Sequence, residues 1–128
     1  MLDREFFLGF IKIHILYHAS KEPIFGAEMT QELARHGYNI SPGTLYPTLH
    51  RLEKEGYLKN SSKVVEGKVR KYYQATAEGK QVLEQSKKRI RELVTEVIEE
   101  KQPDWPVVRI IGEAGIHNKP LLNSGSND

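Results

Sequence analysis

Apolar residues recur along this chain with two different periods, which predict helices in some stretches and strands in another. Residues 3–18 are apolar over most of a helical circumference, and a helix of that kind is buried on more than one side. We therefore expect the first helix to pack between its own domain and a second subunit. Residues 25–36 form the next expected helix, because their apolar positions follow a spacing of four before a glycine.

The stretch 41–58 carries the signals of a capped helix followed by a new element. Ser41 is a typical N-cap, and Pro42 suits the first helical position. Gly56 stands where a left-handed residue commonly ends a helix. The leucines recur at spacings of four and three and so share one face: Leu45, Leu49 and Leu52. Two helices joined by a few residues, the second capped in this way, predict a helix-turn-helix.

A run rich in β-branched and aromatic residues follows and predicts two antiparallel strands, at 57–65 and 68–75. The dipeptide between them ends in a glycine and suits a tight turn. Strand alternation places Tyr73 on the buried face of this hairpin, and Arg70 and Tyr72 on the exposed face.

A long helix is expected to run from its N-cap, Thr76, to about Lys101. Its apolar positions fall roughly in a heptad spacing, and its other positions are mostly charged. A long helix must bury such a stripe, and another subunit is the natural partner. The expected dimer interface combines apolar residues of the first and the long helix: Phe6, Phe7, Phe10, Leu83, Ile90, Leu93, Val94, Val97 and Ile98.

The distribution of charged residues along the chain is more informative about possible partners than the net charge. The net charge of the 128 residues is only +2, which does not by itself indicate a nucleic-acid partner. Residues 59–71 and 87–91 are strongly basic, however, whereas residues 92–104 are acidic. The absence of cysteine excludes disulfides, thiolate nucleophiles and cysteine-based zinc sites, and it fits a cytoplasmic protein. No apolar run approaches the roughly 20 residues of a membrane span, so no membrane partner is expected.

The exposed side of helix 41–54 and the basic hairpin are candidates for contact with a phosphate backbone, because they combine cations, hydroxyls, an imidazole and aromatic rings. A solvated helix face and an edge hairpin protected by lysines are the alternatives. The candidate DNA-binding residues are Ser41, Gly43, Thr44, Tyr46, Pro47, His50, Arg51, Lys54, Lys63, Lys68, Arg70, Lys71 and Tyr72.

Other chemistry is weakly indicated. His14 and His18 lie one helical turn apart, a spacing that suits a metal ion, but no cysteine or carboxylate stands at a supporting spacing. We therefore expect these two histidines to pack against the partner subunit, and we expect no metal or other cofactor. The serines have no histidine–carboxylate partners at a suggestive spacing, and there is no glycine-rich phosphate loop, so we expect no enzymatic activity.

Two motifs resemble the PadR family of bacterial transcriptional regulators. The first is residues 43–53, GTLYPTLHRLE, with the Gly-Tyr-Leu at 56–58, and the second is residues 70–79, RKYYQATAEG. The chain departs from the family pattern at Ala75, where a leucine is usual, and at residues 66–69. The resemblance spans about residues 5–100. It implies a homodimeric repressor or activator that binds an inverted repeat and responds to a small aromatic or lipophilic effector.

The pattern and the resemblance together predict a mainly α fold with a small β-hairpin. We expect a winged helix-turn-helix DNA-binding domain at 1–75, a C-terminal dimerisation helix at 76–102, and a partly disordered tail at 103–128. Trp105 is expected to anchor the tail, with an aromatic ligand pocket as the alternative. The predicted function is sequence-specific regulation of transcription on double-stranded DNA, most simply repression. The alternative is a winged-helix module that binds proteins or ligands without specific DNA binding.

Overall fold

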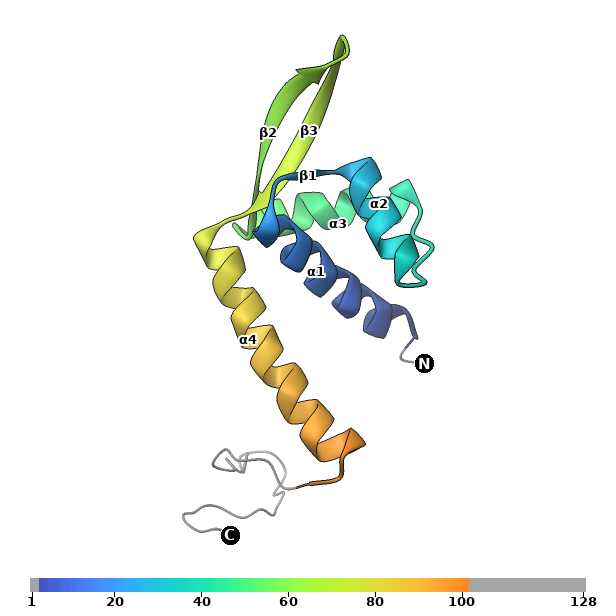
Figure 1. Cartoon of the computed structure of the whole chain (residues 1–128), viewed down its shortest axis with the longest axis vertical. Helices are drawn as coiled ribbons and strands as arrows, with labels where there is room; N and C mark the ends of the chain where they lie inside the picture. Colours follow the sequence, from blue (N-terminus) through green and yellow to red (C-terminus); the bar gives the residue numbers. More distant parts are fainter. Residues whose placement is uncertain (1–2, 102–128) are drawn as a thin grey trace. The chain divides into compact units, whose positions relative to one another are not determined.

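A computed structural model of the chain describes residues 3–101 (Figure 1). The chain divides into two compact units, Met1–Arg89 and Ile90–Asp128. The elements follow in the order α1 (Asp3–Lys21), β1 (Ile24–Phe25), α2 (Gly26–Arg35), α3 (Pro42–Lys54), β2 (Leu58–Val65), β3 (Lys68–Ala75), α4 (Ala77–Leu93) and the π-helix η1 (Val94–Ile98). This order confirms the predicted mainly α fold with a small hairpin sheet. The predicted tail at 103–128, with Trp105, lies outside the described residues.

The core of the first unit forms where α1, α2 and α3 meet the sheet. Its most deeply buried side chains come from all four parts and include Ile15, Met29, Leu45, Leu49 and Tyr73. The burial of Tyr73 confirms the alternation predicted for its strand. Burial raises the pKa of Tyr73, with the Glu53 carboxylate a smaller cause, so its hydroxyl stays neutral in the core.

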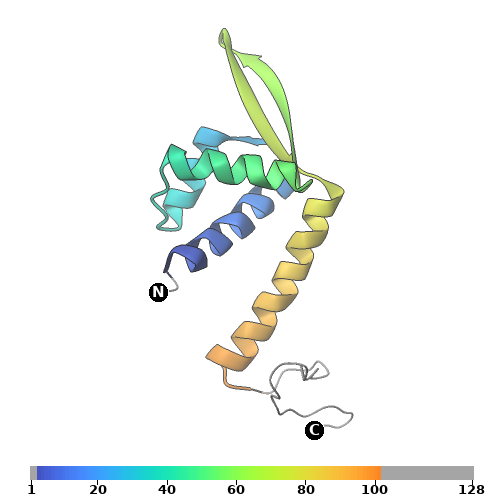
Figure 2. The same cartoon turned by 180° about the vertical axis from the view of Figure 1, so that it is seen from behind.

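The sheet has the strand order β1-β3-β2, and all its pairs are antiparallel. The hairpin of β2 and β3 confirms the predicted strands and extends away from α1, α2 and α3 (Figures 1 and 2). Glu66 and Gly67 connect them, both with positive φ, as a type I′ turn requires. The sequence does not predict β1, because two residues are too few to show alternation and the apolar spacing puts Phe25 at the start of a helix.

The helix-turn-helix forms as predicted, although its cap differs from the expectation. α2 ends in a turn in which Gly37 has φ +88° and the Tyr38 N–H donates to the Leu33 carbonyl at 2.9 Å. Ser41 stands at the N-cap of α3, but its hydroxyl makes no capping bond to the backbone. It donates instead to the Thr44 hydroxyl at 3.3 Å. The expected cap bond is therefore wrong.

Thr76 joins the end of α3 to the start of α4. Its hydroxyl accepts the Gly79 N–H at 3.0 Å, which confirms its predicted cap role, and donates to the Gly56 carbonyl at 2.5 Å. Its own N–H donates to the Tyr57 carbonyl at 3.0 Å. A Cβ atom added to Gly79 would overlap that same Tyr57 carbonyl oxygen. The α4 backbone therefore passes directly over the segment that follows α3, with no room for a side chain.

The second unit is described from Ile90 to Lys101. The α-helix changes at Val94 to a π-helix that ends at Ile98, and the Glu99 N–H donates to the Val94 carbonyl at 2.9 Å. The helical run thus ends three residues before the expected Lys101, because Glu100 adopts a left-handed conformation with φ +55°. No helix among residues 3–101 is both long and apolar enough to cross a lipid bilayer.

We expect the substitution Gly79→Ala to destabilise the protein by about 2–3 kcal/mol, because the added methyl group meets backbone that cannot move aside cheaply. Denaturant unfolding followed by circular dichroism measures this change. Gly9→Ala in α1 is the matched control, since a Cβ there has no heavy atom within 4 Å and alanine favours a helix over glycine by about 1 kcal/mol. Equal stability of the two variants would contradict the close packing at Gly79.

Candidate nucleic-acid interface

The side of α3 opposite the core carries most of the candidate contact residues. The buried residues of this helix are Leu45, Thr48, Leu49 and Leu52. The exposed positions recur at spacings of three and four on the other side, so they form one face. We call this the α3 face: Gly43, Tyr46, Pro47, His50, Arg51 and Lys54. Thr44 is half-buried at its edge, and Ser41 is exposed just before the helix.

The first turns of α3 present backbone groups as well as side chains. A helix N-terminus directs free N–H groups outward and favours a bound anion such as phosphate. Pro47 lies within the helix and has no N–H to donate to the Gly43 carbonyl. The Thr48 hydroxyl donates to the Thr44 carbonyl at 2.7 Å in the next turn. The N-terminal half of α3 therefore carries backbone groups outside regular helical bonding, namely the first N–H groups and the Gly43 carbonyl, to which Pro47 cannot donate.

Tyr46 has a second role in positioning α3. Its side chain is 41% exposed, yet its ring lies so close to Gly26 that a Cβ at that position would overlap it. Gly26 is the first residue of α2. The tyrosine therefore fixes the crossing of the two helices and leaves part of its ring exposed on the α3 face.

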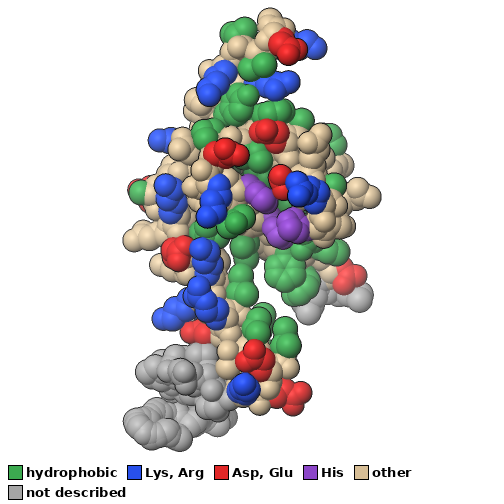
Figure 3. Space-filling model, in the orientation of Figure 1, with side chains coloured by type: hydrophobic (Ala, Val, Ile, Leu, Met, Phe, Trp, Pro, Cys, Tyr) green, Lys and Arg blue, Asp and Glu red, His purple; other side chains and the backbone are tan. Residues whose placement is uncertain are grey.

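The register of the hairpin gathers four cations on one face. Lys63 pairs directly with Arg70, and side chains at alternate positions of the same strand share their side of the sheet. Lys59 and Lys68 consequently join them, whereas Lys71 points to the opposite side, the side of buried Tyr73. We call the first group the wing face: Lys59, Lys63, Lys68 and Arg70. All four side chains are exposed, and Figure 3 shows Lys and Arg side chains over the hairpin.

Aromatic rings accommodate the two like charges at the centre of the wing face. The Lys63 Nζ lies 5.1 Å from the centre of the Tyr72 ring, and the Arg70 Cζ lies 4.3 Å from that of Phe25. The two rings meet edge to face at 5.4 Å. Cation–π attraction of this kind offsets part of the repulsion between paired cations. Phe25 and Lys59 were not among the predicted site residues; the alternation that placed Arg70 would also have found Lys59.

The cations of both faces are free of ion pairs within the described part of the chain. The three pairs formed among residues 3–101 are His18–Glu32, Arg35–Glu32 and Lys87–Glu84. Arg51, Lys54 and the four wing-face cations take part in none of them. Their charges are therefore available to an external anion.

The residues predicted for a dimer interface differ in how much of their surface is exposed. Leu83 is buried in the core of the first unit, with 4% of its surface exposed, so its side chain is not available for a dimer interface. Large exposed apolar side chains remain on α1, at Phe6 and Phe7, and on the C-terminal helical segment, at Leu93, Val97 and Ile98. Phe10, Ile90 and Val94 are half-buried. Within the C-terminal segment, Leu93, Val97 and Ile98 place three exposed apolar side chains within six residues, which is typical of a protein-interaction surface.

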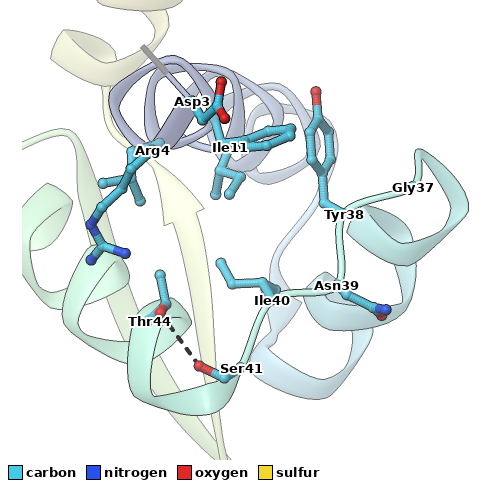
Figure 4. Close-up of a pocket in the computed structure, with 11 residues that line it drawn as sticks. Asp3, Arg4, Ile11, Gly37, Tyr38, Asn39, Ile40, Ser41 and Thr44 are labelled. Atoms are coloured by element: carbon cyan, nitrogen blue, oxygen red, sulfur yellow. Dashed lines mark hydrogen bonds between the residues drawn. The ribbon is translucent and has the colours of Figure 1, made fainter. Parts of the chain in front are cut away.

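A pocket of about 550 Å³ opens between the start of α1 and the turn that leads into α3 (Figure 4). Phe7 and Ile11 line it on the α1 side, and Tyr38 and Ile40 on the side of the turn. Asp3 and Arg4 of α1 also line it, and Ser41 and Thr44 place the pocket beside the beginning of the α3 face. Its size and largely apolar lining suit a small organic molecule.

Comparisons with known proteins agree with this architecture. The sequence model of the Transcriptional regulator PadR-like family matches residues 15–85. The chain is 48% identical over 95 residues to the transcriptional regulator Rv3488 of Mycobacterium tuberculosis, a match that covers 74% of this chain and 89% of the relative.

Two solved structures are similar in fold and sequence. A PadR-like transcriptional regulator from Bacillus cereus is 34% identical, with a TM-score of 0.66, and the match covers 75% of this chain and 95% of that one. A PadR family transcriptional regulator from Eggerthella lenta is also 34% identical, with a TM-score of 0.65 and coverage of 72% and 81%. The winged arrangement, the free cations on α3 and the hairpin, and these matches together show that the chain belongs to the PadR-like family of DNA-binding transcriptional regulators.

Proposed function

We propose that this chain is a homodimeric, cytoplasmic repressor that binds an inverted-repeat operator through the α3 face and the wing face. The observation that carries the proposal is the pair of cationic surfaces on adjacent elements, with no ion pair on either within the described residues. Exposed, unpaired cations favour an external polyanion such as duplex DNA.

The α3 face enters the major groove in this proposal. A helix of 13 residues fits the groove, whose width is about 12 Å. Its N-terminal end, with Ser41 and Thr44, meets a phosphate through hydroxyl and N–H donors. His50 and Arg51 lie farther along the helix and contact base edges, where arginine commonly pairs with guanine.

The wing face contacts the flanking phosphate backbone. Its four cations lie on one side of a hairpin that extends from the helices, so they reach phosphates beyond the groove that α3 occupies. Contacts of this kind add affinity and fix orientation, but they carry little sequence information. In this proposal the α3 face therefore recognises bases, and the wing face adds affinity for the phosphate backbone.

A second copy of the chain covers the exposed apolar side chains in this proposal. Leu93, Val97 and Ile98 are each more than half exposed, and the twofold symmetry of a dimer lets each copy use the same surface. Two α3 helices so related contact half-sites about 34 Å apart, which requires an operator with inverted symmetry. Such a dimer represses by covering DNA that other proteins need.

A small aromatic or lipophilic effector fits the pocket beside α3. The pocket joins α1, which carries exposed phenylalanines, to the turn that leads into the α3 face. A ligand that binds one arrangement of these elements better than another shifts the population between them. The same pocket favours a second candidate function, a ligand-sensing module without specific DNA binding. A salt titration of duplex binding distinguishes this module from the DNA-binding repressor.

We expect the double variant Lys63→Ala/Arg70→Ala to bind all duplexes about tenfold or more weakly at moderate salt. Each phosphate contact contributes about 0.9 to the slope of log affinity against log salt, so the slope should fall by about 2. Fluorescence anisotropy with operator and random duplexes measures both quantities. Lys88→Ala/Arg89→Ala is the control, because it removes the same charge from α4 and should leave the slope unchanged. A wild-type slope near zero would favour the ligand-sensing module.

We expect Arg51→Ala to act on specificity rather than on overall affinity. Loss of a base contact costs about 1–3 kcal/mol on the correct sequence and little elsewhere. The ratio of operator to random-duplex affinity should therefore fall about 5- to 150-fold. An operator obtained by selection from a random duplex pool supplies the probe, and an unchanged ratio would remove Arg51 from base recognition.

We expect Leu93→Glu/Val97→Glu to be monomeric, because two carboxylates would stand where the partner's apolar surface packs. Sedimentation velocity measures the oligomeric state. Glu96→Gln, on an exposed residue of the same turn, should remain dimeric and serves as the control. A dimeric double variant would place the interface elsewhere.

A further inference from the structure

Three histidines from two helices gather beside the helix-turn-helix. His14 and His18 lie one turn apart on α1, and His36 is the C-cap residue of α2. One ring nitrogen from each can be chosen so that all three lie within 4.8 Å of one another. Figure 3 shows histidine side chains next to one another on this face. The sequence indicated only the pair on α1, because the third member comes from the end of another helix.

The three rings lie close together in a roughly parallel arrangement, with angles of 15° and 25° between the plane of His14 and those of His18 and His36. The centres of the His14 and His36 rings are 4.6 Å apart, and that of His18 lies 6.5 Å and 6.4 Å from them. A cavity of about 240 Å³ is lined by all three histidines, with apolar walls from Ile13 and Leu83. All three histidines therefore line one space, which can hold an ion and its solvent.

His18 carries an unmet hydrogen-bonding group at this point. Its Nε2 atom is buried and has no hydrogen-bond partner among the described residues. Buried polar atoms normally have such a partner, and an exception calls for an explanation. The nearest anion is the Glu32 carboxylate, whose Oε1 lies 4.0 Å from Nε2, too far for a hydrogen bond. A metal ion would use this nitrogen as a ligand, and the nearby negative charge would favour a cation.

We propose that His14, His18 and His36 form a binding site for a first-row divalent transition-metal ion such as Zn²⁺, with solvent completing the coordination. Three histidines with an open fourth position are a known donor set for zinc. Zinc–nitrogen bonds of about 2.1 Å in a tetrahedron separate the nitrogens by about 3.4 Å. The three nitrogens must therefore approach one another by up to about 1.4 Å, which side-chain rotation of exposed His36 can supply.

The charged groups around the cluster are compatible with a bound cation. Lys87 lines the same cavity, but its Nζ donates to the Glu84 carboxylate at 3.0 Å. Glu32 contributes negative charge and is shared with Arg35 at 3.6 Å. Burial, and then His36 and His18, lowers the pKa of His14. This shift favours the neutral imidazole, which is the form that ligates a metal.

An ion at this point would join α1 to the end of α2. His36 directly precedes Gly37, where the chain turns toward α3. A metal bound by residues from both sides would oppose separation of these helices and stabilise the folded domain by mass action. A cluster of stacked histidines without a metal is the competing explanation, and it predicts no such stabilisation.

Isothermal titration calorimetry of the full chain, stripped with a chelator, tests the proposal with Zn²⁺ as the probe. We expect one ion per chain and a rise in melting temperature on binding. His36→Gln and His14→Gln should each weaken affinity at least about tenfold. Mg²⁺ should not bind, because it prefers oxygen ligands. His50→Gln, which removes a histidine of α3, should leave zinc affinity unchanged; this control concerns metal binding alone.

Three results would overturn the site. The first is the absence of Zn²⁺ binding to the wild-type chain. The second is unchanged affinity in both His36→Gln and His14→Gln, and the third is an equal loss in His50→Gln, which would indicate adventitious surface binding. Circular dichroism of each variant establishes that it is folded. His36 is exposed, so its substitution is the least disruptive of the three and keeps the test decisive.

Discussion

The close passage of α4 over the segment after α3 is the constraint on which the rest of the first unit depends. Gly79 leaves no space above the Tyr57 carbonyl, and Thr76 bonds to Gly56, Tyr57 and Gly79 at the same place. These contacts fix the end of α3, the base of the hairpin and the start of α4 together. The junction of these uncharged residues therefore helps to set the angle between the α3 face and the wing face, although it is not itself among the candidate DNA contacts.

The second determinant is the division of α3 into two sides. Leu45 and Leu49 are fully buried against the core, and helical periodicity then directs Pro47, His50 and Arg51 outward. Hydrophobic burial thus orients the polar face, and the Asn60 side chain, which donates to the Glu53 carboxylate, adds a polar contact between α3 and the hairpin. Tyr46 adds a constraint along the helix, since its ring fits only over a glycine in α2.

Most of the helices and strands could be predicted from the sequence, because they follow from periodic patterns of apolar residues. Contacts between residues far apart in the sequence could not be predicted in this way. Tyr73 was correctly placed in the core because strand alternation is a local rule. The position of His36 beside His14 depends on how α2 crosses α1, which no spacing along the chain reveals. Leu83 lies on the apolar stripe that predicts a dimer interface, yet it is buried in the core of the first unit. Ser41 has the right residue type for a cap, but its hydroxyl finds a side-chain partner instead.

The π-helix η1 has a consequence for how this family member can vary. A π turn contains about one residue more than an α turn and commonly arises as a bulge within an α-helix. The π turn takes up that extra residue locally, so deletion of one residue between Val94 and Ile98 would restore an α-helix and leave the chain beyond the turn close to its present direction. Leu93, which precedes the turn, would keep its direction as well. In the proposed dimer, a change of one residue in the length of this helix is therefore absorbed within η1 and leaves the apolar side of the preceding helix in place.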